Sequence, residues 1–297
     1  MRVAVTGASG LIGSALVPAL RAAGHDVRRL VRQAPDEPEE IAWDPAAGTI
    51  DAEALVGTDA IVHLAGENIG QRWSPDMRRR IRDSRIDGTR LVAETVATLD
   101  PRPVLLLPSA VGYYGQRGDE ELTERSSAGK GFLPDLVQAW EAAADPARKA
   151  GARVVHFRQG VVLGTGGGAI ARMRLPFSLG VGGRVGNGRQ WWSWVALDDV
   201  VAAYLYALEH PLESVYNLAA PAVRNHDFVR ALGAALHRPT VFPVPGFVIR
   251  LLWGEMGEEM LLGGQRVIPE RLPGAGFTLA HPEIDEALVH VLAERPA

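Results

Sequence analysis

The feature that most constrains the fold of this chain is a glycine-rich turn near its start, TGASGLIG at Thr6–Gly13. A short apolar run precedes the turn and apolar residues at helical spacing follow it, as expected where a strand leads into a helix packed on a sheet. Gly7 allows the tight turn, Gly10 lets the backbone approach a pyrophosphate, and Gly13 lets the helix pack close to the strand. The helix N-terminus adds free N–H groups and a positive dipole end. The sequence therefore predicts a dinucleotide-binding turn.

Strand and helix patterns alternate through the first half of the chain, which is typical of an α/β protein with a parallel, doubly wound sheet. The predicted strands are 2–5, 27–31, 60–64, 104–107 and 153–157, and the helical patterns between them include 83–99 and 133–148. Right-handed crossovers place the carboxyl ends of the strands, and with them any ligand, at one edge of the sheet.

The sequence changes character after Gly160, where Gly-rich loops at 165–168 and 180–188 flank a predicted helix at 169–179. Such loops suit a lid or a substrate-facing segment better than a core strand. Beyond them we predict helices at 199–209 and 282–292, a strand at 215–218 and a helix capped by Asn225. The expected domains are a Rossmann domain at 1–165, to which 195–220 returns, and a smaller C-terminal substrate-binding domain made of 166–194 and 221–297.

Composition excludes several classes of partner and site. The net charge of −4 gives no reason to expect a nucleic acid or an anionic membrane as partner. The absence of cysteine excludes disulfides and thiolate chemistry, and the eight histidines show no ligand spacing, so we predict no metal site. No apolar run reaches the roughly 18 to 20 residues of a membrane helix. The chain leads straight into a strand with no signal-peptide pattern, so we expect a cytoplasmic protein, monomeric or homodimeric.

Further segments carry a family resemblance: DAIVHLAG at 59–66, SAVGYYG at 109–115, RQGVVLG at 158–164 and WVALDDV at 194–200. With TGASGLIG, which matches a TGxxGxxG fingerprint, they make the chain resemble the extended and atypical short-chain dehydrogenase/reductases, the NAD-dependent epimerase/dehydratase superfamily. It is most similar there to the bacterial "epimerase family protein" subgroup, through SAVGYYG, Trp140-Glu141, YNL at 216–218 and GQRVIP at 264–269. The resemblance runs nearly end to end. It implies a nicotinamide cofactor but no substrate, because members of the subgroup mostly lack an assigned reaction.

The end of the second predicted strand indicates which nicotinamide cofactor is bound. An Asp or Glu there would hydrogen-bond the ribose 2′-hydroxyl of NAD, but no acid lies between Val27 and Pro35. Arg32 stands at that place, and a guanidinium pairs with a 2′-phosphate, so we expect NADP(H) in preference to NAD(H). The alternative is that Arg32 is a solvated residue after a strand. The turn and the resemblance together give the expected cofactor contacts: Gly7, Ser9, Gly10, Leu11, Ile12, Gly13, Arg32, Leu64, Ala65, Gly66, Arg85, Gly160 and Val161.

The usual catalytic pair of the resembled family is missing. That pair is a Tyr followed four residues later by a Lys, which lowers the Tyr pKa. The chain has only two lysines, Lys130 and Lys149, and neither follows a Tyr at that spacing. Aligning Trp140-Glu141 with the family helix puts Leu133 and Val137 in the two places. Standard Tyr/Lys chemistry is therefore not expected.

The catalytic candidates that remain are Ser109, Tyr113 and Tyr114. By the resemblance, Ser109 would hydrogen-bond a substrate hydroxyl or carbonyl. A Tyr would serve as proton donor if Arg85 or the cofactor lowers its pKa; the alternative is that both tyrosines only pack and cap a loop. Arg117 follows Tyr113 at the dyad spacing, but glycines on both sides make this segment a loop. Weaker candidates, each with a structural alternative, are Glu67, Asn68, Gln71, Arg72, Trp73, Glu141, Asp199 and the tryptophans of 191–194.

Two functional hypotheses remain open. The first is an NADP(H)-dependent oxidoreductase or epimerase-like enzyme (an isomerase) acting on a small polar substrate, with nucleotide-linked sugars as one candidate class. The second is an NADP(H)-binding sensor or regulatory module without turnover, which the missing Tyr/Lys pair favours. An interaction protein with a relic site is disfavoured by the intact glycines and by Arg32.

Overall fold

A computed structural model describes residues 1–293 and contains one large, mostly parallel sheet. Its strand order is β12-β8-β6-β5-β1-β2-β3-β4. The bounds are β1 Arg2–Thr6, β2 Asp26–Val31, β3 Glu40–Asp44, β4 Thr49–Ile50, β5 Ala60–His63, β6 Val104–Ala110, β8 Val154–Gln159 and β12 Ser214–Leu218. All neighbours pair in parallel except β3 with β4, which are antiparallel. The predicted α/β class and its parallel sheet are confirmed.

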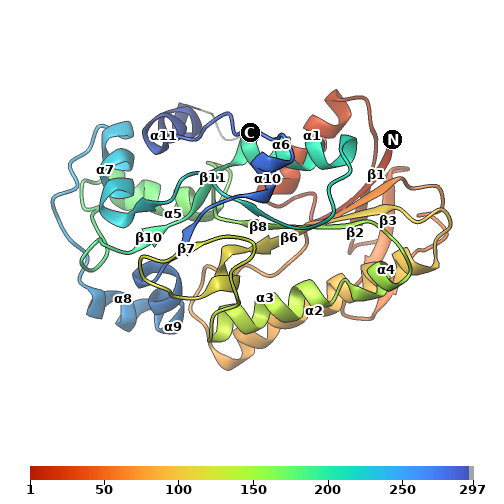
Figure 1. Ribbon diagram of the computed structural model, residues 1–297, viewed down its shortest axis with the longest axis horizontal. Helices are drawn as coiled ribbons and strands as arrows, with labels where there is room; N and C mark the ends of the chain where they lie inside the picture. The colour runs from red at the N-terminus through yellow and green to blue at the C-terminus, as the bar shows by residue number, and fades with distance from the viewer. Residues whose placement is uncertain (294–297) are drawn as a thin grey trace.

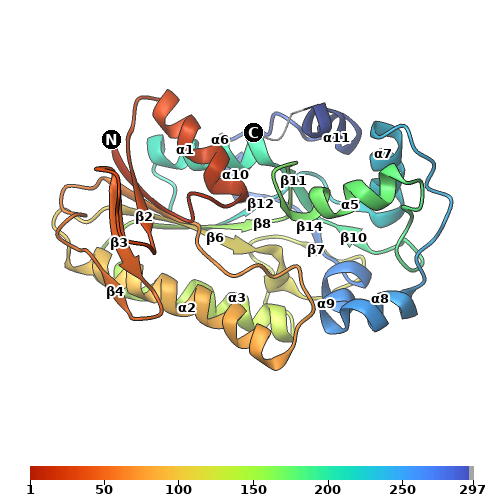
Figure 2. The same ribbon diagram turned by 180° about the vertical axis from the view of Figure 1, so that it is seen from behind.

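Helices cover both faces of the sheet (Figures 1 and 2). One face carries α1 (Leu11–Ala22) and α6 (Leu197–Glu209), and the other carries α2 (Pro75–Thr98), α3 (Phe132–Ala142) and α4 (Asp145–Lys149). Successive strand residues alternate between these layers, as the period of two requires. In β6, Leu106 packs with α1 and α6, whereas Leu105 and Leu107 pack with α2.

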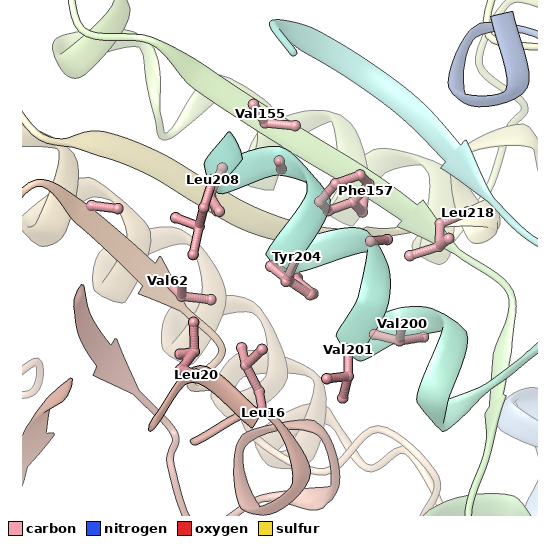
Figure 3. Close-up of a cluster of buried hydrophobic side chains, with 14 of the residues drawn as sticks. Leu16, Leu20, Val62, Val155, Phe157, Val200, Val201, Tyr204, Leu208 and Leu218 are labelled. Carbon is pink, nitrogen blue, oxygen red and sulfur yellow. The ribbon is translucent and has the colours of Figure 1, made fainter. Parts of the chain in front are cut away.

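The core between the sheet and the α1/α6 layer is made of interlocking aliphatic and aromatic side chains (Figure 3). Leu16 and Leu20 of α1 meet Val62 of β5, while Tyr204 of α6 lies edge-on to Phe157 of β8 at 5.1 Å between ring centroids. Because each of these side chains is almost fully buried, the core fixes the helix N-termini relative to the strand ends. The glycine-rich turn is therefore held in a rigid frame.

A second group of short elements lies at the carboxyl edge of the sheet, with α5, α7, α8 and α9 side by side in Figure 1. Its strands are β7 Glu121–Leu122, β9 Val161–Leu163, β10 Trp191–Trp192, β11 Trp194–Ala196, β13 Val223–Arg224 and β14 Arg266–Val267. Its helices are η1 Val111–Tyr114, α5 Gly168–Ser178, α7 Asn225–Ala235, α8 Gly246–Trp253, α9 Glu255–Gly257, η2 Glu258–Leu262 and α11 Ile284–Ala293. Helix α10 (Arg271–Gly274) instead packs beside β12, with Leu272 in the core of the α1/α6 layer. Trp192 and Trp194 are buried in its core with Phe228, so two of the clustered tryptophans pack rather than face a ligand.

Three local expectations differ from the structure. The predicted helix 133–148 is divided into α3 and α4, with Ala143 and Ala144 between them. Helix α2 begins at Pro75, well before the expected residue 83, because the Ser74 hydroxyl accepts the Met77 N–H (3.1 Å) and Pro75 occupies the first turn. Asn225 is not a helix cap: it is the first residue of α7, and its side-chain oxygen accepts the Val185 N–H at 2.8 Å. Among residues 1–293, no helix combines the length and the apolar character needed to cross a bilayer.

Candidate active site

The three glycines of the opening turn have different surroundings. Gly7 has φ +68°, and a side chain there would lie 2.8 Å from the Ala65 nitrogen. A β-carbon on Gly13 would lie 2.2 Å from the Gly7 oxygen, so the start of α1 is pressed against the turn. A β-carbon on Gly10 would meet only the Gly7 oxygen, at 3.3 Å, and both Ser9 and Gly10 are exposed. Gly7 and Gly13 therefore shape the turn, while Gly10 leaves its outer side open.

Thr6 joins the ends of β1 and β5 beneath this turn. Its hydroxyl accepts the N–H groups of Leu64 (3.1 Å) and Ala65 (3.2 Å) and lies 2.8 Å from Nδ1 of His63. Because the oxygen accepts twice, its own proton is donated to Nδ1, which makes the His63 ring neutral. Burial lowers the pKa of His63 to about 4. Leu64 and Ala65 thus lie directly beside the turn, as a shared cofactor site requires.

Arg85 of α2 lies under the loop that follows β5. Its Nη1 donates to the carbonyl oxygens of Glu67 (2.9 Å) and Ile81 (3.3 Å), and its guanidinium stands near Gly66 and over the Trp140 ring. Burial lowers the pKa of Arg85 to about 10, so it remains a cation at neutral pH. Arg85 therefore supports Gly66 and provides positive charge beside it.

The remaining expected cofactor contacts lie at neighbouring strand ends. Gly160, directly after β8, has no room for a side chain, since a β-carbon would lie 2.7 Å from the Trp194 nitrogen. The Val161 N–H donates to the Ser193 oxygen at 2.8 Å. Arg32 follows β2, is exposed, and has no ion pair within residues 1–293. All the expected cofactor contacts therefore lie along the carboxyl edges of β1, β2, β5 and β8 or on the adjoining helices α1 and α2.

A buried polar network crosses three neighbouring strands. Ser109 of β6 is in register with Arg158 of β8, which is in register with Asn217 of β12, so the three side chains share one face. Glu141 of α3 lies above them. It accepts the Ser109 hydroxyl at 2.6 Å and receives Nε and Nη2 of Arg158 at 2.8 Å each. This two-pronged contact is the strong geometry for an Arg–carboxylate pair.

Arg158 is the centre of the network, and only 5% of its surface is exposed. Burial alone would lower the pKa of Arg158, but the hydrogen bonds and charge of Glu141 outweigh that effect and raise it. Sequence reasoning ranked Glu141 only as a weak candidate and did not single out Arg158. The available signal was a cation directly after the predicted strand at 153–157, where a buried residue of that strand would continue.

The two tyrosines of η1 have different environments. The Tyr114 hydroxyl donates to the Asn217 side-chain oxygen (2.7 Å) and receives Nη1 of Arg158 (3.2 Å); burial raises its pKa. Tyr113 is half-buried, with its ring 3.3 Å from the Arg158 guanidinium. Its hydroxyl has no hydrogen-bond partner in the described part of the chain. Arg117, at the dyad spacing, is paired instead with Glu120 at 2.8 Å.

Known protein families and structures are similar to this chain along most of its length. Residues 3–219 match the model of the NAD dependent epimerase/dehydratase family. The chain belongs to this family. Residues 244–291 match a separate domain of unknown function, DUF1731. The resemblance expected from the motifs is therefore confirmed.

Relatives match along nearly the whole chain. An "epimerase family protein Mb2239" of Mycobacterium bovis is 48% identical over 289 residues, covering 96% of each chain. The crystal structure of human epimerase family protein SDR39U1 (isoform 2) with NADPH has a TM-score of 0.88 and 37% identity, covering 98% of this chain and 99% of the human one. A nucleoside-diphosphate sugar epimerase of Corynebacterium glutamicum has a TM-score of 0.83 and 35% identity, covering 98% of this chain and 58% of its own.

Proposed function

We propose that this chain is an NADP(H)-dependent oxidoreductase or epimerase-like enzyme acting on a small polar substrate. The observation that carries the proposal is the opening turn, whose outer side is open at Gly10 while an exposed Arg32 stands at the end of the next strand. The open glycine admits a pyrophosphate, and the arginine provides a charge-assisted contact for a 2′-phosphate. The human relative crystallised with NADPH supports the same cofactor.

The bound cofactor would supply a hydride at its nicotinamide ring. The residues of this chain would hold and orient it: the backbone of residues 9–13 at the pyrophosphate, Leu64, Ala65 and Gly66 beside the turn, and Gly160 and Val161 near the nicotinamide side. The likeness to a nucleoside-diphosphate sugar epimerase favours nucleotide-linked sugars as a candidate substrate class. The expected cytoplasmic location and the monomeric or dimeric state stay predictions.

For the proton transfer, we propose Tyr113 as the donor. Of the three sequence candidates, only Tyr113 combines partial exposure with a hydroxyl that no described residue occupies. Its ring lies on the Arg158 guanidinium, and this cation–π contact holds the side chain beside the buried network. The hydroxyls of Ser109 and Tyr114 both make hydrogen bonds within the buried network. We therefore propose that these two residues position Arg158 and η1.

The sensor hypothesis keeps one observation in its favour. Ser109 is 3% exposed, and its hydroxyl is bound to Glu141, so the family's usual substrate contact is engaged within the protein. In that case NADP(H) binding would be intact while no substrate is turned over. Binding and turnover must therefore be measured separately.

Cofactor choice is tested with Arg32→Asp by titrating NADPH and NADH. A charge-assisted contact is worth about 1.5 to 3 kcal/mol, so NADPH affinity should fall about 10- to 150-fold while NADH affinity changes little. Arg102→Asp, an exposed arginine before β6 at the opposite edge of the sheet, is the matched control and should leave both affinities unchanged. Equal weakening of both cofactors by Arg32→Asp would remove the basis for NADP(H).

Turnover is tested by following the reduced nicotinamide absorbance against a panel of sugars, ketones and quinones. For an active substrate, Tyr113→Phe should lower kcat by about 100-fold or more, as loss of a general acid does, without changing NADPH affinity. The matched control is Tyr206→Phe on α6, because the Tyr206 hydroxyl donates to the Ala275 carbonyl, away from the proposed site. NADPH binding with no turnover across the panel would support the sensor instead.

A further inference from the structure

A cluster of possible metal ligands lies outside the site described above. Asp198 of α6, His281 in the loop before α11, and His290 of α11 each offer one donor atom, and these atoms all lie within 4.8 Å of one another. Nε2 of His290 is 2.7 Å from an oxygen of Asp198. The two imidazole rings are stacked, with centroids 4.1 Å apart and planes at 19°. None of the three residues belongs to the glycine-rich turn or to the Arg158 network.

The backbone that carries each of these ligands is independently anchored. Asp199, next to Asp198, uses both carboxylate oxygens to accept the N–H groups of Ala280 (2.6 Å) and His281 (3.1 Å). The segment that holds His281 is thereby fixed to the first turn of α6. Helix α11, which holds His290, buries one apolar face against the core formed with α7. The fold therefore brings the three side chains together, and binding an ion would require one imidazole to rotate out of the stacked arrangement.

We propose that Asp198, His281 and His290 form a binding site for a divalent transition-metal ion, with Zn²⁺ as the best-fitting cation. Two imidazole nitrogens and one carboxylate oxygen are a preferred donor set for Zn²⁺, and a water completes four-coordination. An ion bound here would replace the close contact between His290 and Asp198 with one metal–ligand bond to each residue. His281 and His290 are half-buried and the Asp198 side chain is 47% exposed, which leaves a path for entry from solvent.

The site would join parts of the chain that are far apart in sequence. Asp198 lies in the first turn of α6, whereas His281 and His290 lie in the segment matched by the domain of unknown function. An ion held by all three would fasten this C-terminal segment to the start of α6. The role is therefore structural, and it is separate from the proposed NADP(H) site. It also departs from the expectation of no metal site, because ligands at positions 198, 281 and 290 show no motif spacing.

The test is a Zn²⁺ titration of the full chain, prepared without a histidine tag and treated with chelator, by calorimetry. Co²⁺ absorbance then reports the coordination number. We expect one Zn²⁺ per chain, an intense tetrahedral-type Co²⁺ spectrum, and a raised unfolding temperature on adding Zn²⁺. His281→Ala and Asp198→Asn should each weaken Zn²⁺ binding by at least 30-fold. The matched control is His226→Ala, since His226 also contacts an aspartate, Asp227 at 3.2 Å, but is in no such cluster.

Three results would overturn the proposal. They are the absence of saturable one-to-one Zn²⁺ binding by the unsubstituted chain, full Zn²⁺ affinity in His281→Ala, and an equal loss of affinity in His226→Ala. The first result needs no substitution, so it holds even if a variant folds poorly. NADPH affinity measured on the same samples should not change, which keeps the outcome independent of the proposed enzyme function.

Discussion

Replacing His63 tests how this buried histidine makes the free energy of unfolding depend on pH. This ring is fully buried beneath the glycine-rich turn, accepts the Thr6 hydroxyl at Nδ1, and packs edge-on to Trp43 at 5.7 Å. Its Nε2 has no hydrogen-bond partner among residues 1–293. Protonation would place a charge in a dry interior and take away the acceptor of Thr6. The substitution His63→Asn keeps an acceptor near the Nδ1 position but cannot titrate in this range.

The magnitude follows from the pKa of His63, which is 6.5 in an unfolded chain and about 4 in the folded protein. Between these values the unfolded chain binds a proton that the folded chain does not, so the free energy of unfolding falls as the pH decreases. Relative to pH 8, the loss from this one group is about 2 kcal/mol at pH 5 and about 3 kcal/mol at pH 4. The full shift corresponds to about 3.4 kcal/mol. Above pH 7 the contribution is constant.

The assay is urea unfolding of the unsubstituted chain and of His63→Asn at pH 8, 5 and 4. The variant should be less stable at pH 8, because it leaves a small cavity, and the gap between the two proteins should shrink by about 2 kcal/mol at pH 5. Burial also lowers the pKa of His156, but this residue is present in both proteins and cancels in the difference. His237→Asn, an exposed histidine at φ 54°, should show a constant gap. A gap that does not change with pH in His63→Asn would refute the reasoning.

Two further predictions concern the turn and the buried network. Gly10→Val should abolish NADPH binding in calorimetry while the circular dichroism spectrum stays unchanged, and unchanged NADPH affinity in this variant would reject the site. Gly13→Ala should instead lower the free energy of unfolding by about 1 to 3 kcal/mol or more, because its β-carbon would overlap a turn carbonyl. Glu141→Gln should lower the free energy of unfolding by about 3 to 5 kcal/mol, because Arg158 is left buried without a carboxylate. Glu120→Gln, which breaks an exposed pair, should cost under about 1 kcal/mol, and an equal cost for both would contradict this.

The parts of the fold that the sequence predicts are those set by local chemistry. Apolar strand runs and helical periodicity identified the central strands, and the glycine turn was located because each glycine has a local steric reason. The first turns of α2 were missed because this segment is rich in arginine and carries only two apolar side chains, Met77 and Ile81. Both are buried against α3, and the Ser74 cap fixes where the helix begins. Strands β3 and β4, the last two at one end of the sheet, were also missed, since their neighbours in sequence are polar loops.

The candidate site was only partly predictable because its polar network depends on strand register. Ser109, Arg158 and Asn217 meet only because β6, β8 and β12 pair in one particular alignment. A shift of one residue would turn each side chain to the other face. Nothing local to Glu141 marks it as the partner of both Ser109 and Arg158. The metal-ligand cluster has the same origin, since three anchored segments are needed to assemble it.

The positions that the family would use for its Tyr and Lys are filled here by packed apolar side chains. Leu133 and Val137 on α3 are 9% and 2% exposed, and Leu133 lies against Gly112 of η1, where a β-carbon would be only 3.3 Å from it. A lysine at Val137 would bury an ammonium group beside the already compensated Arg158–Glu141 pair, which is unfavourable without a further carboxylate. Restoring the dyad by two substitutions should therefore destabilise the protein instead of restoring the family's chemistry. The proton donor proposed above, Tyr113 of η1, is half-buried, so the packing of α3 leaves it accessible.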